Sequence, residues 1–256
     1  MTKFTTPTGE RPVALVTGAT GGLGEQICHT LAQAGCAVVA GYRSSAEAAQ
    51  SLVAKLDGAG HRAFAAPVTD SAALARLADN VATHYGRCDV LVNCAGTTRF
   101  VAHDDLDGMS DALIDDVLAT NVRGPFAMVR ALRPLLEKST LAGGAVVINI
   151  SSIAAQTAMG SNVIYCASKA ALDNLTKSLA RALAPRIRVL SVSPGLVDTE
   201  FVKSMDTAWR DEQAARTPLG RLADPREIAQ AVLVAARDLH FSTGCVLPVD
   251  GGRPLR

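Results

Sequence analysis

Tyr165 and Lys169 are four residues apart in a stretch whose apolar residues repeat with a helical period. Residues at i and i+4 lie on one face of a helix, so we expect the phenol and the ammonium to point to one place. A phenol has a reference pKa of about 10, and a nearby cation favours its ionised form. The hydroxyl of Ser152, after a short apolar run, could hold a substrate oxygen there. Together the three groups would suit proton transfer to or from a carbonyl or alcohol oxygen.

Each of these features also has an ordinary structural explanation. A tyrosine and a lysine at this spacing are usually an unrelated surface pair, and serines that follow a strand are usually caps. The chemical interpretation therefore depends on the elements that would position these side chains.

Strand-like and helix-like segments alternate along the chain. Apolar and β-branched runs predict strands at 13–16, 37–40, 62–66, 89–92, 145–150, 188–192 and 245–249. Apolar periodicity predicts helices at 23–34, 46–56, 71–85, 106–136, 160–183, 200–215 and 226–236, with 200–215 mobile. This alternation predicts the α/β class, as a single-domain Rossmann-like doubly wound parallel sheet of about seven strands with helices on both faces. We expect residues 1–11 to be a flexible tail and 12–256 to be one catalytic domain.

Composition excludes several function classes. The 256 residues are 48% hydrophobic and 19% charged, which fits one large domain, and a net charge of +1 gives no reason to expect nucleic acid. No apolar run is long enough to span a membrane, and the N-terminus lacks an apolar signal segment, so a cytoplasmic protein is expected. The six cysteines have no CxxC spacing and the five histidines are scattered. We therefore predict buried free cysteines and no metal site.

A glycine-rich turn lies between the first predicted strand and the first predicted helix. Residues 17–24 read TGATGGLG. Glycines let the backbone turn tightly and approach a pyrophosphate, whose charge a helix N-terminus favours. The candidate cofactor contacts here are Gly18, Thr20, Gly21, Gly22, Leu23 and Gly24. The spacing is G-x-x-x-G-x-G rather than the commoner G-x-G-x-x-G.

Further motifs follow in a fixed order, namely Asn93-Cys94-Ala95-Gly96, Asn121, Ser152, Tyr165-x-x-x-Lys169, Pro194-Gly195 and Val249-Asp250-Gly251-Gly252. With the glycine turn they make residues 12–252 resemble the short-chain dehydrogenase/reductase family, closest in pattern to its 3-oxoacyl-[acyl-carrier-protein] reductase-like branch. The resemblance implies that Tyr165 is the general acid/base, that Lys169 favours the ionised phenol and holds the nicotinamide ribose, and that Ser152 orients the substrate carbonyl. It further implies that Asn121 supports a water linking Lys169 to solvent. Without the other motifs, Asn121 would be assigned to a solvent-facing helix position. Further cofactor contacts are implied for Val68, Asn93, Ala95, Gly96, Tyr165, Lys169, Pro194, Gly195, Val197 and Thr199.

The residues after the second strand indicate which nicotinamide cofactor binds. Tyr42 stands where NAD-preferring members of the family carry aspartate. Arg43 and Ser44 follow, and an arginine suits a 2′-phosphate through its charge and its forked donors. We therefore predict NADP(H). After the third strand, Pro67-Val68 replaces the family's aspartate-valine, which leaves the adenine contact open, and Asp70 is displaced from that position.

Substrate contacts are expected in the loops 97–107, 153–164 and 196–218. The last loop is a candidate lid, in which Phe201, Met205 and Trp209 would cover the substrate with Ser152 and Tyr165, or would simply pack on the body of the protein. The expected reaction is NADPH-dependent reduction of a ketone or 3-oxoacyl group. A 3-oxoacyl-[acyl-carrier-protein] reductase is the narrower alternative. The resemblance implies basic residues near the cleft that bind an acidic carrier protein. Arg186 stands where one of them lies, but residues 139–145 contain no basic residue for the other. A catalytically idle dinucleotide sensor is the remaining alternative. The resemblance also implies a homotetramer.

Overall fold

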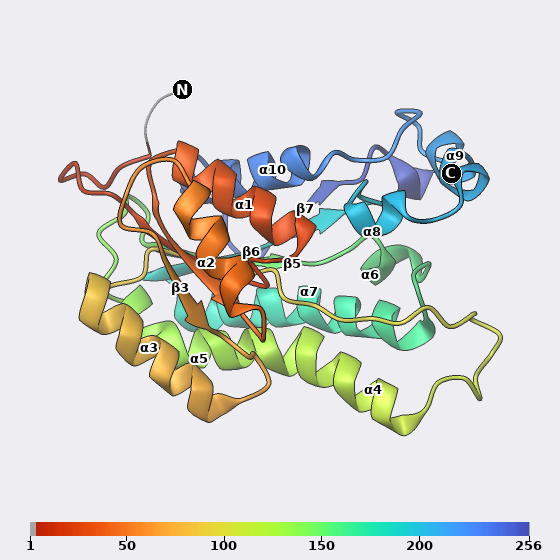
Figure 1. The fold of residues 1–256 in the computed structure, drawn as a ribbon, viewed down its shortest axis with the longest axis horizontal. Helices are drawn as coiled ribbons and strands as arrows, with labels where there is room; N and C mark the ends of the chain where they lie inside the picture. The colour runs from red at the N-terminus through yellow and green to blue at the C-terminus, as the bar shows by residue number, and fades with distance from the viewer. Residues whose placement is uncertain (1–3, 256) are drawn as a thin grey trace.

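A single parallel sheet of seven strands organises the protein (Figure 1). The computed structural model describes residues 4–255, apart from the side chain of Phe201. The sheet order is β3-β2-β1-β4-β5-β6-β7. Strands β2 and β3 therefore lie on one side of β1 and strands β4 to β7 on the other, so the strand order reverses between β1 and β4. Ligands of such sheets bind at this switch point, beyond the carboxyl ends of the strands. The strands span Val13–Thr17 (β1), Ala37–Tyr42 (β2), Arg62–Ala65 (β3), Val90–Asn93 (β4), Ala145–Ile150 (β5), Ile187–Pro194 (β6) and Val246–Val249 (β7).

Helices cover both faces of the sheet, as Figure 1 shows. Their bounds are Gly22–Gln33 (α1), Ala46–Lys55 (α2), Ser71–Tyr85 (α3), Asp111–Leu118 (α4), Gly124–Leu136 (α5), Ala154–Thr157 (α6), Val163–Leu183 (α7), Glu200–Lys203 (α8), Thr207–Ala215 (α9) and Pro225–Arg237 (α10). A π-helical turn, Ala119–Arg123 (η1), joins α4 to α5, and a 3₁₀ turn, Arg253–Leu255 (η2), follows β7. Helices α1, α2 and α10 pack on one face, and α3, α5 and α7 pack on the other. The predicted doubly wound sheet is confirmed.

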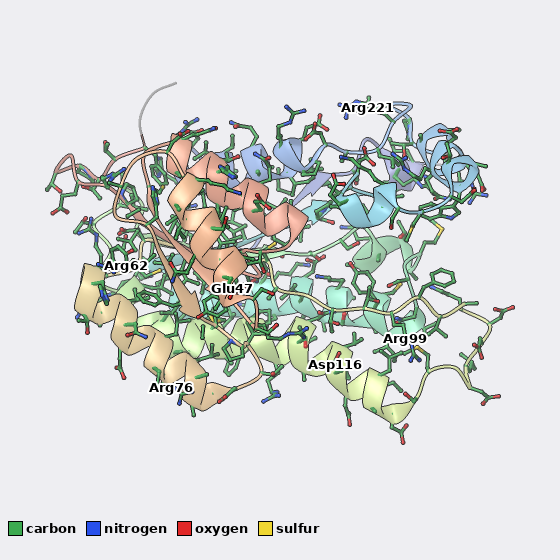
Figure 2. The ribbon with its side chains drawn as sticks, viewed as in Figure 1. Glu47, Arg62, Arg76, Arg99, Asp116 and Arg221 are labelled. Atoms are coloured by element: carbon green, nitrogen blue, oxygen red, sulfur yellow. The ribbon has the colours of Figure 1, made fainter. Side chains whose placement is uncertain are left out.

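Alternating residues of each central strand belong to different cores. Ala14 and Val16 of β1 join the core that contains α1 and α10. Val13 and Leu15 join the core that contains α3 and α5. Because both faces are covered, the central strands are mostly apolar rather than alternately polar. Charged side chains such as Glu47, Arg62, Arg76 and Asp116 are exposed on the outer surface (Figure 2).

Two of the predicted helices differ from the structure. The helix expected at 106–136 begins only at Asp111, because the Ser110 hydroxyl caps it by accepting a hydrogen bond from the Leu113 N–H. The helix expected at 200–215 is divided into α8 and α9. The Asp206 carboxylate accepts from the Trp209 N–H and so begins a second helix.

Residues 4–11, for which a flexible tail is expected, contact the folded domain at both ends of the segment. Phe4 is 3% exposed and packs into the core beside α1, and its N–H donates to the Ala34 carbonyl at 2.8 Å. Arg11 donates to the Ala59 carbonyl at 2.6 Å. The fold is more stable when the apolar side chain of Phe4 covers the core than when this side chain and the core are both exposed to water. Residues 1–3 of the predicted tail and Arg256 lie outside the described residues.

The cysteines are free in the described structure, and most are buried. Burial raises the pKa of the Cys36 thiol to about 12. Cys245 is exposed, so the prediction of burial is wrong for this residue. Within residues 4–255, every helix is too short or too polar to span a bilayer.

Candidate active site

Tyr165 and Lys169 lie on one face of α7, as their spacing predicts. The Lys169 ammonium is 5.6 Å from the centre of the Tyr165 ring. Lys169 is buried, and its Nζ donates to the Ile150 carbonyl at 2.8 Å, at the carboxyl end of β5. The helix therefore brings a phenol and a fixed cation to the sheet edge where ligands bind.

Ser152 and Ser151 have different roles after β5. The buried Ser151 hydroxyl is directed to the Lys169 carbonyl at 3.5 Å. Ser152 is half-buried, and its Oγ accepts from the Ala154 N–H at 3.2 Å. A Cβ added to Gly160 would lie 3.0 Å from Tyr165 Cδ1 and 3.1 Å from Ala154 Cβ. The turn that holds Ser152 and the tyrosine ring thus border the same glycine.

Asn121 lies in the π-helical turn and is 1% exposed, which excludes the solvent-facing position. Its Oδ1 accepts from the Thr97 N–H at 2.8 Å, and its Nδ2 donates to the Thr97 carbonyl at 3.0 Å. The same amide nitrogen donates to Ser168 Oγ at 3.1 Å, and that hydroxyl donates to the Tyr165 carbonyl at 2.7 Å. Sequence reasoning missed Ser168, because a serine inside a helix gives no signal of its partner.

Gly96 leaves room beside these groups. A Cβ added there would lie 3.4 Å from Asn121 Oδ1 and 3.8 Å from the Lys169 ammonium. A larger side chain would occupy the space next to the cation. The glycine at the end of the Asn-Cys-Ala-Gly segment thus keeps side-chain atoms out of the space beside Asn121 and Lys169.

The glycine turn packs tightly between β1 and α1. Gly18 has a φ of +65°, and a Cβ added to Gly24 would collide with the Gly18 carbonyl. Gly21 is the N-cap of α1 and provides no side-chain cap, so the first N–H groups of this helix are free to face an anion. Thr20, Gly22 and Leu23 complete the turn, and Gly22 lies against Thr199. The turn therefore fits a pyrophosphate.

The Thr17 hydroxyl joins this turn to the loop after β4. Its oxygen accepts from the Cys94 N–H at 3.1 Å and the Ala95 N–H at 3.0 Å. The Ala19 N–H donates to the Gly41 carbonyl at 3.0 Å, which brings the end of β2 to the turn as well. Tyr42, Arg43 and Ser44 follow directly.

Tyr42 is more buried than the two residues that follow it. Tyr42 packs against the core beside α1, whereas Arg43 and Ser44 are exposed. The Arg43 guanidinium makes no ion pair or hydrogen bond within the described part of the chain. Its charge is therefore available to a ligand at the end of β2.

The residues after β3 make packing and capping contacts within the fold. Val68 is 8% exposed and packs closely on Gly124. The Asp70 carboxylate caps α3 by accepting from the Ala72 and Ala73 N–H groups at 2.9 and 3.0 Å. No adenine contact is therefore assigned to Asp70.

Asn93 ends β4, and its side chain is engaged on the face of the sheet that α7 covers. Its amide nitrogen donates to Asn149 Oδ1 at 2.8 Å, and Asn149 Nδ2 donates to Thr176 Oγ1 at 2.8 Å. The Thr176 hydroxyl also contacts Ser191 Oγ at 2.8 Å. These four buried polar residues link β4, β5, β6 and α7 beneath the site.

The segment after β6 begins at the sheet edge. The Gly195 N–H donates to the Val249 carbonyl, and the Pro194 carbonyl accepts from the Ile153 N–H, both at 3.0 Å. Val197 forms an isolated bridge to Ala223, and Thr199 caps α8. Pro194 and Thr199 thus lie next to the turns that hold Ser152 and Gly22.

The expected lid is built from α8 and α9. Met205 is half-buried and Trp209 is 37% exposed, while the side chain of Phe201 lies outside the described residues. Ion pairs join Asp198 to Arg210 at 2.9 Å and Glu200 to Lys203 at 2.8 Å. Among the described side chains, neither Met205 nor Trp209 forms a hydrogen bond or ring contact with Tyr165.

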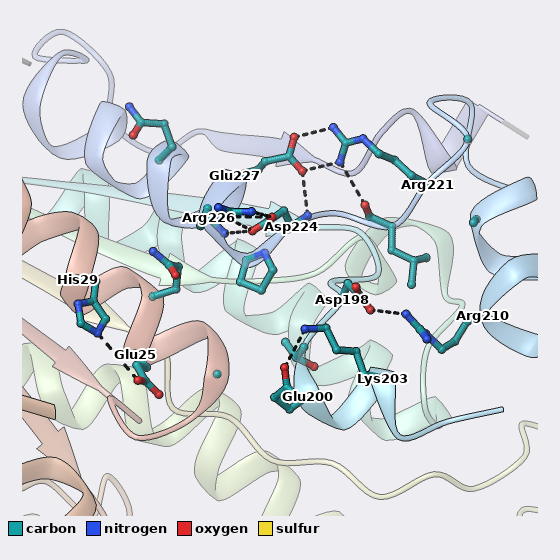
Figure 3. A pocket seen from close by; sticks show the side chains of 18 of the residues that line it. Glu25, His29, Asp198, Glu200, Lys203, Arg210, Arg221, Asp224, Arg226 and Glu227 are labelled. Atoms are coloured by element: carbon teal, nitrogen blue, oxygen red, sulfur yellow. Dashed lines mark hydrogen bonds and ion pairs between the residues drawn. The ribbon is translucent and has the colours of Figure 1, made fainter. Parts of the chain in front are cut away.

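A charged groove of about 1450 Å³ lies between this segment, the start of α1 and α10 (Figure 3). It meets the cofactor-binding candidates at Gly22 and Thr199 but is not lined by Ser152, Tyr165 or Lys169. Its acidic and basic side chains largely pair with one another, as Arg221 does with Glu227. It therefore borders the site rather than forming its reaction chamber. Among residues 4–255, no three His, Cys, Asp or Glu side chains come together as a metal site would require.

Comparison with known proteins agrees with this geometry. A family model described as enoyl-(acyl carrier protein) reductase matches residues 18–253. D-threitol dehydrogenase from Mycolicibacterium smegmatis is 39% identical over 95% of this chain and 93% of its own length. The 3-oxoacyl-[acyl-carrier-protein] reductase FabG from Thermotoga maritima is 34% identical over 95% of this chain and 98% of its own. A crystal structure from Burkholderia xenovorans, assigned to the short-chain dehydrogenases/reductases, has a TM-score of 0.87 at 34% identity and covers 96% of this chain and 99% of that chain.

The chain therefore belongs to the short-chain dehydrogenase/reductase family. Members of this family are oxidoreductases that act on CH–OH or C=O groups with nicotinamide dinucleotide cofactors. The chain is an oxidoreductase of this kind.

Proposed function

We propose that the protein reduces a ketone or 3-oxoacyl group to the alcohol with NADPH. The observation that carries the proposal is the placement of the Lys169 ammonium 5.6 Å from the Tyr165 ring and 3.8 Å from the position that a Cβ at Gly96 would occupy. The glycine turn reaches the same sheet edge through the Thr17 hydroxyl. When bound, the cofactor supplies the hydride that the carbonyl carbon accepts.

The protein's own groups handle the proton. In the proposed reaction, the Tyr165 hydroxyl gives its proton to the substrate oxygen as the carbonyl carbon gains the hydride. The Ser152 hydroxyl donates a hydrogen bond to that oxygen and holds it in reach. The Lys169 ammonium favours the phenolate left behind, while its bond to the Ile150 carbonyl keeps it in place. Asn121 holds the Thr97 backbone beside this group, so the proposed water relay would begin in an ordered setting.

NADPH rather than NADH is proposed because of the residues at the end of β2 and directly after it. Position 42 carries a tyrosine. An acidic side chain at this position would bind the ribose hydroxyls and repel a phosphate. Arg43 is exposed and without a partner in the described structure, and Ser44 follows it. A guanidinium offers charge and paired donors to a 2′-phosphate.

A 3-oxoacyl thioester on a carrier protein is the narrower substrate. The 34% identity to a 3-oxoacyl-[acyl-carrier-protein] reductase favours it, and Arg186 is exposed at the predicted position. The lack of a basic residue in 139–145 argues for a free small-molecule ketone instead. The homotetramer and the cytoplasmic location also stay predictions, which light scattering and cell fractionation would measure.

The test is a screen of NADPH oxidation with acetoacetyl thioesters on coenzyme A and carrier protein, cyclic ketones, quinones and sugars. Tyr165→Phe should lower turnover of any substrate found by about 10²-fold or more, since it removes the proton donor. Its melting temperature and NADPH affinity should match the parent's. Tyr85→Phe is the control, because Tyr85 bonds to the Gly60 carbonyl away from the site. Tight NADPH binding without turnover of any carbonyl would favour the idle sensor.

A further inference from the structure

Asn162 joins two segments that border the candidate site. Its side chain is fully buried. The side-chain oxygen accepts a hydrogen bond from the Tyr165 N–H at 2.6 Å. The side-chain nitrogen donates to the Arg99 carbonyl at 2.7 Å and to Thr98 Oγ1 at 3.2 Å. One amide thus connects the backbone of the tyrosine to the start of the loop that follows β4.

A second path closes the connection from the other side of the tyrosine. The Tyr165 carbonyl accepts from Ser168 Oγ, which in turn accepts from Asn121 Nδ2. Asn121 holds both the N–H and the carbonyl of Thr97. Both backbone groups of Tyr165 therefore lead through side chains to residues 97–99.

The loop 97–107 makes further bonds to the residues just before α7. The Val101 N–H donates to the Ser161 carbonyl at 2.9 Å, and the Thr98 and Ser161 hydroxyls share a hydrogen bond. His103 Nε2 is bonded to the Gly160 carbonyl at 3.1 Å. The loop start and the start of α7 thus form one hydrogen-bonded unit, with Asn162 buried at its centre.

We infer that Asn162 is a positioning residue that keeps the loop 97–107 and the Tyr165 backbone in one geometry. The inference rests on the proposed function for its catalytic consequence. A proton donor must reach the substrate oxygen within hydrogen-bond distance, and a displacement of about 1 Å costs on the order of 10²-fold in rate. If the loop moved independently of Tyr165, a substrate in contact with the loop would lie at a varying distance from the Tyr165 hydroxyl.

Capping alone does not require an amide. An N-cap needs one acceptor, which serine supplies as well as asparagine. Asn162 uses its acceptor for the cap and its two donors for the loop, so an amide matches all three partners. Replacement by serine should keep the first function and remove the second.

The experiment compares Asn162→Ala and Asn162→Ser with the parent in the full chain, with Ser110→Ala as a matched loss of a cap on α4. Hydrogen exchange of the segments 97–105 and 162–168, the melting temperature, kcat and the NADPH Kd are measured for each. Asn162→Ala should lose both protection and stability. Asn162→Ser should recover the melting temperature and the protection of 162–168, yet leave residues 97–105 exchanging about tenfold faster. Its kcat should stay about tenfold or more below the parent's, with the NADPH Kd within about twofold.

Recovery of loop protection and kcat by Asn162→Ser would overturn the inference, because Asn162 would then be only a cap. Loop exchange at the parent rate in Asn162→Ala would overturn it too. Ser110→Ala should change neither the loop nor kcat. If the parent reduces no carbonyl in the screen, the proposed function fails, while the exchange rates still decide whether Asn162 holds the loop to Tyr165.

Discussion

Short polar side chains hold the backbone around the candidate site. Thr17 accepts two backbone N–H groups of the loop after β4, and Asn121 satisfies both backbone groups of Thr97. Buried polar groups are costly without partners, so each of these contacts also fixes a position. Single residues thus set where the loops begin, although the helices and strands supply the frame.

Arg43 provides a test of cofactor choice at this scale. Arg43→Ala should raise the KM for NADPH by about 10- to 100-fold, the loss of one charge-assisted contact, and leave the KM for NADH nearly unchanged. Arg62→Ala is the matched control, because Arg62 is an exposed arginine at the start of β3 (Figure 2). Steady-state kinetics with both cofactors measure the effect. Equal changes for NADPH and NADH would contradict a 2′-phosphate contact.

The spacing of residues predicted some of these positions and missed others. The interval between Tyr165 and Lys169 was sufficient, because helical geometry alone puts them on one face. The spacing did not predict that the Asn93 amide nitrogen would donate to Asn149, and the cofactor contact of Asn93 stays a prediction. Asn162 gave no signal of its contact with the loop, because Thr98 and Arg99 lie more than sixty residues away in the chain.

At the scale of elements, Arg188 shows how a strand supports a helix. It is 5% exposed in β6, and its guanidinium donates to carbonyls at and beyond the end of α10, among them Ala236 at 3.1 Å and Leu239 at 2.8 Å. The last carbonyls of a helix have no intrahelical partner. Arg188 therefore satisfies groups that would otherwise be buried without donors.

Arg188→Met should lower the free energy of unfolding by about 2–3 kcal/mol, because it removes charged donors from buried carbonyls. Urea denaturation measures the change, and kcat per folded molecule should match the parent's. Arg237→Met is the control, since Arg237 forms a solvent-accessible pair with Asp238 that should contribute less than about 1 kcal/mol. A loss of similar size in both variants would contradict the capping role.

The charged residues at the N-terminal end of α10 predict that the stability of the fold depends on pH. Hydrogen bonds from Arg226 lower the pKa of Asp224 to about 2, and those from Arg221 lower the pKa of Glu227 to about 2. A depressed pKa stabilises the fold above the unfolded value of about 4, and the contribution disappears as pH falls towards the folded value. Because both carboxylates are solvent-exposed, screening keeps the effect small.

The double variant Asp224→Asn/Glu227→Gln should therefore melt below the parent at pH 7, and the two melting curves should converge as pH falls towards about 2. Thermal unfolding at a series of pH values measures this. Glu47→Gln, an exposed acid on α2 (Figure 2), should follow the parent. A constant difference at every pH would show that the carboxylate charges do not contribute.

Sequence periodicity predicted most elements because their apolar residues face a common core. It failed where a single polar side chain sets a boundary, as Ser110 and Asp206 do. It also failed at η1, because one extra residue in a helical turn leaves the pattern of apolar residues almost unchanged. The order of the elements was therefore predictable, and their ends were not.

At the scale of the whole molecule, the two cores on either side of the sheet bury its central strands. The N-terminal residues contribute to one of them through Phe4. Phe4→Ala should lower the free energy of unfolding by about 3–5 kcal/mol, the usual range for a buried phenylalanine. Thr5→Ala, its exposed neighbour, should change it by less than about 0.5 kcal/mol. Denaturant unfolding measures both, and equal values would contradict the packing of this segment.

The π-helical turn restricts how the length of this chain can change. Each residue of an α-helix advances by about 100°, so deleting one residue from Ala119–Arg123 would turn α5 by that angle relative to α4. Either Met128 and Leu132 would leave the core, or Asn121 would lose Thr97. We expect point substitutions to be tolerated on the outer face of this helix pair, whereas single-residue insertions and deletions within it should be eliminated by selection.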